Sequence, residues 1–149
     1  MHSKALQRII PLTLILLAVP AMRGADSIPP AREKLPAGVR EISISETEKL
    51  LHERPDAAVI DVRTAEEFSE QGHLPHARLV DYFREDFIDA LGTLKLDPAK
   101  PCIVYCAIGG RARRAAVKMA NLGYKEILLP KGSFKAWKEA GKPIEGGKK

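Results

Sequence analysis

The sequence predicts a small α/β domain, with a parallel sheet that helices cover on both faces. Short runs of strand-forming residues alternate with helical patterns, which is typical of parallel sheets. The run from Cys102 to Cys106 is apolar without alternation, as expected of a strand buried on both faces. A length of 149 residues suits one such domain. Ligands in these folds bind beyond the carboxyl ends of the strands.

Capping residues mark two helices in the N-terminal half. Ser45 and Glu48 have the spacing of a capping box, for a helix that ends before Pro55. Thr64 and Glu67 have the same spacing and predict a second, short helix. The strands around these helices are expected at residues 39–44, 57–62 and 77–81.

Three further helices are expected, the first two marked by apolar residues at helical spacing. They are expected at residues 83–92, 111–122 and 133–140, the first two ended by glycine and the last stopped by glycine and proline. The remaining strands are expected at residues 102–106 and 126–129. Cys106 and Asp61 therefore both lie at carboxyl ends of strands, where a site is expected.

The segment from Cys106 to Arg111 is the strongest functional pattern. Gly109 and Gly110 permit backbone conformations in which several N–H groups can converge above the Cys106 sulfur. Arg111 then opens a helix whose first turn carries three arginines, although the helix dipole already makes that end positive. An anion over the loop would remove this conflict, either a Cys106 thiolate or an anionic substrate. The alternative is a solvated basic turn.

Three further motifs accompany this loop in a fixed order. They are Asp61-Val62-Arg63 with Glu67-Phe68, then Gly72-His73-Leu74-Pro75, then Gly132 with Ala136-Trp137. Together with the loop they resemble the four signatures of the rhodanese-like sulfurtransferase family, over about residues 39–145. The chain departs from the family pattern at His76, where glycine is usual, and at Ala107 and Ile108, where charged or hydroxyl residues are common.

The resemblance implies a reaction in which Cys106 takes the outer sulfur of a donor as a persulfide. The donor would be a small sulfur-containing anion or a persulfide, and the acceptor a thiol or cyanide. No metal or organic cofactor is required, and a monomer is expected. The residues that would bind the anion and stabilise the persulfide are Ala107, Ile108, Gly109, Gly110 and Arg111.

Four upstream residues are expected to support the loop. The spacing of Asp61, Arg63 and Glu67 favours an ion-paired, hydrogen-bonded brace over acid–base catalysis, and His73 is expected to pack beneath the loop. His73 and His76 could suggest a metal, but two ligands without a third make a weak site. We expect His76 in a solvent-facing turn, with a contact at the substrate rim as the alternative.

Two other function classes stay open. A cysteine phosphatase or arsenate reductase of this fold would use a loop one residue longer, sized for a tetrahedral oxyanion. A binding or sulfur-carrying module without turnover would fit Ala107 and Ile108, because neither side chain donates a hydrogen bond.

A disulfide between the two cysteines is not expected. Along a strand, Cys102 and Cys106 would have Cα atoms about 13 Å apart, whereas a disulfide requires about 7 Å or less. Cys106 should therefore be a free thiol, ionised near neutral pH in its basic surroundings. Cys102 is expected to be a small core residue.

The N-terminal region predicts export to the periplasm or the exterior. Residues 1–21 combine Lys4 and Arg8 with a short apolar run, which is typical of a signal peptide. The run is shorter than the roughly 20 residues that span a bilayer, and the alternatives are an uncleaved membrane anchor or a disordered basic tail. A proline-rich linker is expected at 22–38, the domain at 39–145 and a basic tail at 146–149.

The charge distribution argues against nucleic acid as a partner. The net charge is +5, but the lysines are scattered along the chain. Aromatic residues make up only 5% of the sequence, whereas single-stranded nucleic acid is bound by clustered cations and stacking rings. We therefore expect no nucleic-acid partner.

Overall fold

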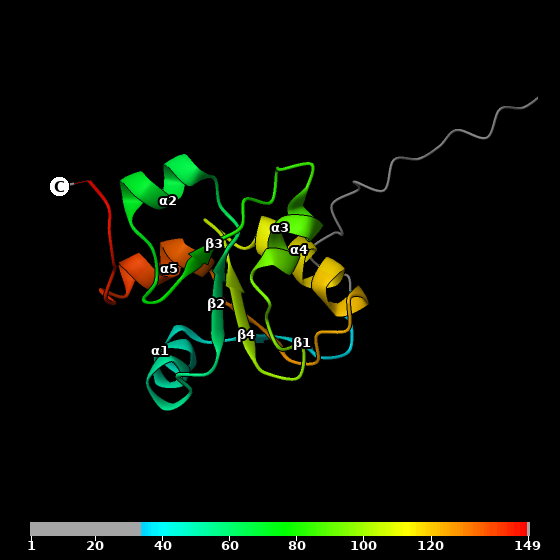
Figure 1. The fold of residues 1–149 in the computed structure, drawn as a ribbon. Helices are drawn as coiled ribbons and strands as arrows, with labels where there is room; N and C mark the ends of the chain where they lie inside the picture. The colour runs from blue at the N-terminus through cyan, green and yellow to red at the C-terminus, as the bar shows by residue number, and fades with distance from the viewer. Residues whose placement is uncertain (1–33, 149) are drawn as a thin grey trace, which may run out of the picture.

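A five-stranded parallel sheet organises the computed structural model, which describes residues 34–148 (Figure 1). The strand order is β1-β5-β4-β2-β3, and every pair of neighbours is parallel. The predicted fold class is therefore confirmed. The strands are β1 (Val39–Ile42), β2 (Ala58–Asp61), β3 (Arg78–Leu79), β4 (Cys102–Tyr105) and β5 (Ile127–Pro130).

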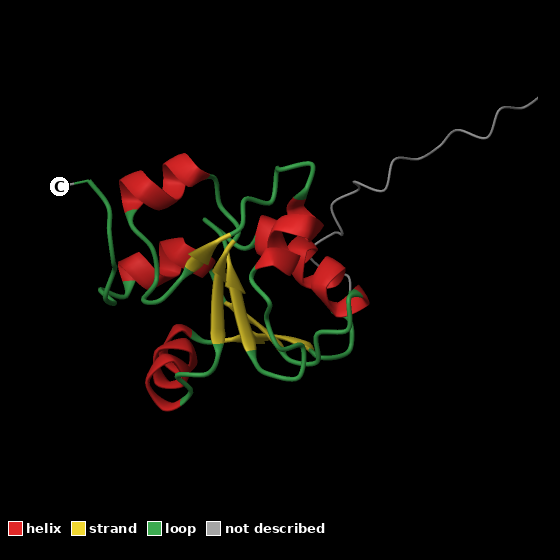
Figure 2. Ribbon diagram, in the orientation of Figure 1, coloured by secondary structure: helices red, strands yellow, loops and turns green. Residues whose placement is uncertain are grey.

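Helices cover both faces of this sheet, as Figure 2 shows. On one side lie α3 and α4, and on the other lie α1, α2 and α5 (Figure 1). The bounds are α1 (Ile44–Glu53), α2 (Ala65–Gln71), α3 (Phe87–Thr93), α4 (Gly110–Asn121) and α5 (Ser133–Glu139). No helix within residues 34–148 is long and apolar enough to cross a membrane.

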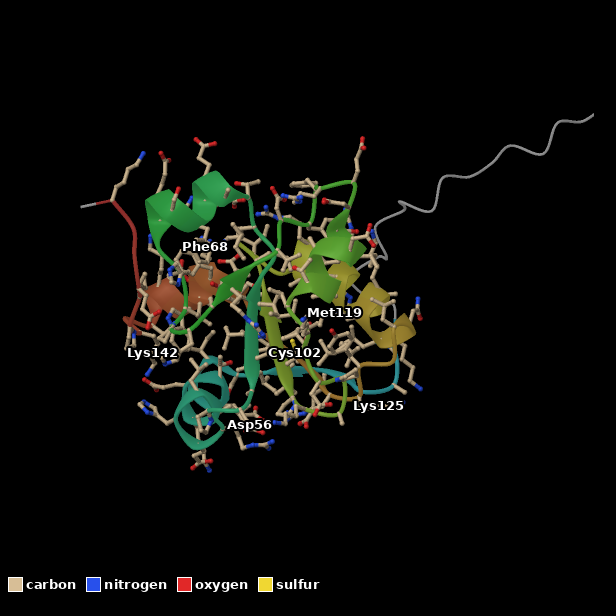
Figure 3. The ribbon with its side chains drawn as sticks, in the orientation of Figure 1. Asp56, Phe68, Cys102, Met119, Lys125 and Lys142 are labelled. Carbon is tan, nitrogen blue, oxygen red and sulfur yellow. The ribbon has the colours of Figure 1, made fainter. Side chains whose placement is uncertain are left out.

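Strand β4 is central in the sheet and divides its side chains between two cores. Cys102 and Val104 pack with Met119 of α4 on one face (Figure 3). Ile103 and Tyr105 belong to the core on the other face, toward α1 and α5. All four residues of β4 are buried, which explains why the sequence of this strand is apolar without alternation.

Several element boundaries differ from those predicted, and two of these differences lie at the starts of helices. The capping box of α1 is formed by Ser43 and Glu46, two residues before the predicted pair. Both pairs have the same spacing, but β1 already ends at Ile42, so the chain enters the helix earlier. Helix α3 begins at Phe87, and Phe83 lies in the preceding turns with its side chain exposed.

The structure describes the C-terminal end of the chain as far as Lys148, whereas the first 33 residues lie outside it. The predicted signal peptide, residues 1–21, and most of the linker lie outside the described residues. At the other end, the segment 145–148 runs beside residues 70–73 in the structure. The backbones of His73 and Glu145 bond to each other reciprocally at 2.9 Å, and the Lys148 N–H donates to the Glu70 carbonyl at 3.0 Å. The predicted tail is thus attached to the fold as far as Lys148.

Candidate active site

Cys106 lies where the central strand ends and the loop before α4 begins. Gly109 is the N-cap of α4 and has φ +109°, in the left-handed region that favours glycine. A Cβ at this position would meet no atom within 4 Å, so the need for glycine is conformational and not steric. This turn brings the Gly109 N–H within 3.1 Å of the Cys106 Sγ. Of the converging N–H donors expected from residues 107–111, Gly109 supplies the hydrogen bond seen at the sulfur.

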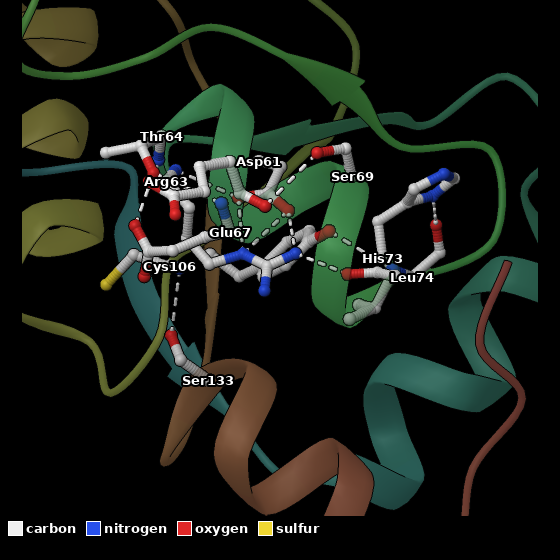
Figure 4. Close-up of polar contacts among 12 residues, drawn as sticks. Asp61, Arg63, Thr64, Glu67, Ser69, His73, Leu74, Cys106 and Ser133 are labelled. Carbon is white, nitrogen blue, oxygen red and sulfur yellow. Dashed lines mark hydrogen bonds and ion pairs between the residues drawn. The ribbon is translucent and has the colours of Figure 1, made fainter. Parts of the chain in front are cut away.

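The first turn of α5 holds the backbone of Cys106. The Cys106 N–H donates to the Ser133 Oγ at 3.2 Å (Figure 4). The carbonyls of Cys106 and Ala107 accept the N–H groups of Phe134 and Lys135, each at 3.0 Å. Three hydrogen bonds therefore join the start of the loop to α5.

Ser133 is a site residue that the sequence reasoning missed. It is buried and has φ +55°, which is unusual for a residue with a side chain. The preceding Gly132 also has positive φ, and a Cβ there would lie 2.6 Å from the Cβ of Ala136. The only available signal was its place beside Gly132 in a recognised motif, and nothing in that pattern indicates a bond to Cys106.

Arg111 forms a bidentate ion pair with Glu67 of α2. Its Nη1 and Nη2 lie 2.6 and 2.7 Å from the two carboxylate oxygens, and both side chains are largely buried. The hydrogen bonds from Arg111 are the main cause that lowers the pKa of Glu67 to about 2. The same bonds raise the pKa of Arg111 against the opposing effect of burial, with a smaller contribution from the Cys106 side chain. The charge of Arg111 is thus already balanced by Glu67.

Asp61 and Arg63 form a second ion pair, fully buried behind the loop. The shortest distance, from Arg63 Nη2 to Asp61 Oδ2, is 2.6 Å. The same Nη2 donates to the carbonyl of Gly72 at 2.7 Å, and the guanidinium stacks 3.9 Å from the ring centre of Phe134. Since the Phe134 N–H holds the Cys106 carbonyl, this ion pair reaches the loop through α5.

The structure corrects the expected position of His73. Figure 4 shows its ring on the far side of Arg63 from Cys106. The ring stacks on Phe68 with centroids 4.0 Å apart, and Nδ1 lies 3.0 Å from the carbonyl oxygen of Leu74. The reciprocal backbone bonds to Glu145 fix the residue there, so it does not pack beneath the loop.

Leu74 and His76, which lie close to His73 in the sequence, have different surroundings from it. The Leu74 N–H donates to the buried Tyr105 hydroxyl at 3.1 Å, and burial raises the pKa of that hydroxyl. His76 is exposed in a turn with φ +60°, and its N–H donates to Glu145 Oε2 at 3.0 Å. Among residues 34–148, no group of three or more histidine, cysteine or acidic side chains is arranged to hold a metal ion.

Comparison with known proteins agrees with this arrangement. The family model described as "Rhodanese-like domain" matches residues 43–140, and the chain belongs to that family. It is 28% identical to thiosulfate sulfurtransferase 18 of Arabidopsis thaliana, over 71% of this chain and 83% of that protein. It is 30% identical to thiosulfate sulfurtransferase GlpE of Coxiella burnetii, over 66% of this chain and 87% of the relative.

A solved structure gives the same result. The polysulfide-sulfur transferase homodimer of Wolinella succinogenes superposes with a TM-score of 0.62 and 30% identity. The match covers 72% of this chain and 78% of that one. The chain thus has sulfurtransferase relatives of similar size at modest identity.

Proposed function

We propose that the protein is a sulfurtransferase that carries a sulfane sulfur on Cys106. The observation that carries this proposal is the hydrogen bond from the Gly109 N–H to the Cys106 Sγ at the carboxyl end of β4. An N–H aimed at sulfur favours negative charge there, first on the thiolate and then on the persulfide. Relatives named as thiosulfate and polysulfide transferases support the same chemistry.

The reaction proceeds in two balanced displacements. The Cys106 thiolate attacks the outer sulfur of the donor, the new sulfur–sulfur bond forms, and the old bond leaves its electron pair on sulfite, a thiolate or the polysulfide shortened by one sulfur. An acceptor thiolate or cyanide then attacks the outer sulfur of the persulfide, and the electron pair returns to Cys106. Neither step requires an oxidant, a metal or a cofactor.

Persulfides and polysulfides are the donors that this site favours over thiosulfate. The side chains of Ala107 and Ile108 have no hydrogen-bond donor for a sulfonate group. Arg111 would be the natural cation for that group, but Glu67 already occupies both of its terminal nitrogens. An uncompensated sulfonate next to this loop would gain little. A persulfide brings less charge, and a polysulfide, although a dianion, has no sulfonate oxygens that need hydrogen-bond donors.

Mass spectrometry of the intact protein tests this proposal. Incubation with polysulfide should add one sulfur atom to the Cys106 peptide, and a thiol or cyanide should remove it. Cys106→Ser should abolish the gain, because a hydroxyl is a far weaker nucleophile near neutral pH. Loading without discharge to any acceptor would favour the carrier alternative. Cys106-dependent hydrolysis of an aryl phosphate without sulfur loading would favour the phosphatase.

We also propose that residues 1–21 direct export and are then removed. The basic head and short apolar run support this. N-terminal sequencing of the protein isolated from its cells should find a new terminus at about residues 18–25. Recovery of intact Met1 in the cytoplasmic fraction would contradict export.

A further inference from the structure

The tip of the active-site loop presents a large apolar side chain to the surface. Ile108 is 73% exposed, only two residues from the buried Cys106. Ile108 lines two surface hollows. One hollow extends to Lys131 and Ser133, and the other to Lys135 and Lys138. We call Ile108 with these two hollows the loop-tip surface.

Basic side chains outnumber acidic ones on the loop-tip surface. Among the described residues that line the two hollows, the charged ones are Arg113, Lys131, Lys135 and Lys138, with Glu41 and Glu139 as the only acids. Both acids are paired within the surface, Glu41 to Arg113 at 3.4 Å and Glu139 to Lys135 at 3.9 Å. Lys131 and Lys138 make no ion pair within residues 34–148. The described residues that line each hollow therefore carry a net positive charge.

We infer that the sulfur acceptor is a peptidyl cysteine in an extended segment that has apolar neighbours and nearby acidic residues. This inference rests on the proposed sulfurtransferase function and names its acceptor class. Cyanide or a small thiol would leave Ile108 in water, whereas apolar side chains beside the acceptor cysteine would cover it. Acidic residues farther along the segment would lie over the lysines of the two hollows.

The burial of Cys106 favours an extended segment as the docking partner. Cys106 is 1% exposed, so a flat protein surface would meet Ile108 before its thiol could reach the persulfide. An extended strand can place one cysteine at the loop while its flanking residues lie in the hollows. The acceptor thiolate then attacks the outer sulfur, and the electron pair of the broken bond returns to the Cys106 Sγ.

Discharge of the loaded protein to synthetic peptides tests the inference. The protein is first loaded with polysulfide and desalted. Three blocked pentapeptides with a central cysteine are compared: leucines beside the cysteine and glutamates at the ends, the same with terminal lysines, and the first with serines replacing leucines. Each rate is divided by that peptide's rate with a small-molecule persulfide, which removes differences in intrinsic thiol reactivity.

The glutamate–leucine peptide should discharge Cys106 about ten-fold faster than either other peptide at low salt. Its preference over the peptide with terminal lysines should shrink as salt screens the charges, whereas its preference over the serine peptide, which depends on apolar contact, should persist. In Lys138→Glu, and separately in Ile108→Ser, the rate with this peptide relative to dithiothreitol should fall several-fold. Lys49→Glu, on the remote helix α1, is the matched control and should keep the wild-type ratio.

The outcomes separate this inference from the function on which it rests. Equal normalised rates for the three peptides, or a preference for terminal lysines, would overturn the acceptor class, while sulfur loading and discharge to dithiothreitol would still support the transferase. A protein that takes up no sulfur would contradict the proposed function itself. If both variants keep the wild-type ratio of peptide rate to dithiothreitol rate, the loop-tip surface does not bind the acceptor segment and the inference is wrong.

Discussion

The Ser133 hydroxyl oxygen accepts the backbone N–H of Cys106 at 3.2 Å, across 27 residues of sequence. Ser133 keeps this position with φ +55°, a conformation that glycine adopts more easily than serine. Ser133 therefore combines an unfavourable backbone conformation with a hydrogen bond to the backbone of Cys106. Strain of this kind is often found at functional sites.

Two substitutions of Ser133 separate these effects. Ser133→Ala keeps the strained backbone and loses the hydrogen bond, so the free energy of unfolding should fall by about 1 kcal/mol. Ser133→Gly loses the same bond but relieves a strain of about 1–2 kcal/mol, so its stability should match or exceed that of the wild type. Urea denaturation measures both values.

Sulfur loading then shows whether the bond matters for function. If the hydroxyl positions Cys106, both variants should load sulfur more slowly, although only Ser133→Ala is expected to be less stable than the wild type. A wild-type loading rate in Ser133→Gly would mean that the hydroxyl serves only the fold.

The ion pair between Glu67 and Arg111 should make stability depend on pH. Glu67 has an ordinary pKa of 4.5, and its hydrogen bonds to Arg111 lower the pKa to about 2 in the folded protein. The stabilisation is complete above about 4.5 and is lost as the pH falls toward 2, because the unfolded chain binds the proton first. Glu67→Gln should lower the free energy of unfolding by about 1–2 kcal/mol at neutral pH.

The difference between wild type and Glu67→Gln should shrink steadily over that acidic range. Chemical denaturation at several pH values measures it. Glu53→Gln is a suitable control, because its ion pair with Lys49 is exposed and 3.8 Å long. A gap between wild type and Glu67→Gln that stays constant down to pH 2 would show that the ion pair does not lower the Glu67 pKa.

The sequence predicted interactions between near neighbours better than those between distant ones. The capping box of Thr64 and Glu67 formed as expected, because its partners are three residues apart and helix geometry alone brings them together. The pairing of Glu67 with Arg111 spans 44 residues and depends on how α2 and α4 meet beyond the sheet. Ser133 was missed for the same reason.

His73 shows the limit of reasoning from a motif. Its place in the Gly72-His73-Leu74-Pro75 motif led to the expectation that it packs beneath the loop, but the chain beyond α5 returns and pairs with it. The sequence gives no periodic signal for that return, because the paired segment near Glu145 lies in no regular element. By contrast, the apolar pattern of β4 depended on burial alone and was sufficient to place Cys106.

Gly109 and Gly110 should respond differently to the same substitution. Gly109→Ala should cost about 1–3 kcal/mol in folding free energy, because alanine does not readily adopt φ +109°. If the turn relaxes, the N–H to Sγ bond is lost and sulfur loading should slow. Gly110 lies in α4 without positive φ and with open space at its Cβ position, so Gly110→Ala should be neutral or slightly stabilising.

Denaturation midpoints and loading rates of the two variants give the comparison. Gly110→Ala serves as the control for an added methyl group near the loop. Equal stability losses in both variants would indicate that crowding, not backbone conformation, explains the glycine at position 109.

The two cysteines should differ sharply in reactivity. Burial raises the pKa of Cys102 to about 12, and the residue lies in β4 between β2 and β5, so its exposure requires the sheet to open. Cys106 lies at the start of a loop whose next residues, Ala107 and Ile108, line surface hollows, so we expect its thiol to be reached without opening of the sheet. Iodoacetamide at neutral pH should therefore modify Cys106 in the native protein and both residues only in denaturant.

Cys102→Ala should still load sulfur on Cys106, at a cost in stability of about 1 kcal/mol for the small cavity that the lost sulfur atom leaves. Peptide mapping decides the assignment: sulfur or label found first on Cys102 would mean that the central strand, and not the loop after it, carries the reactive thiol.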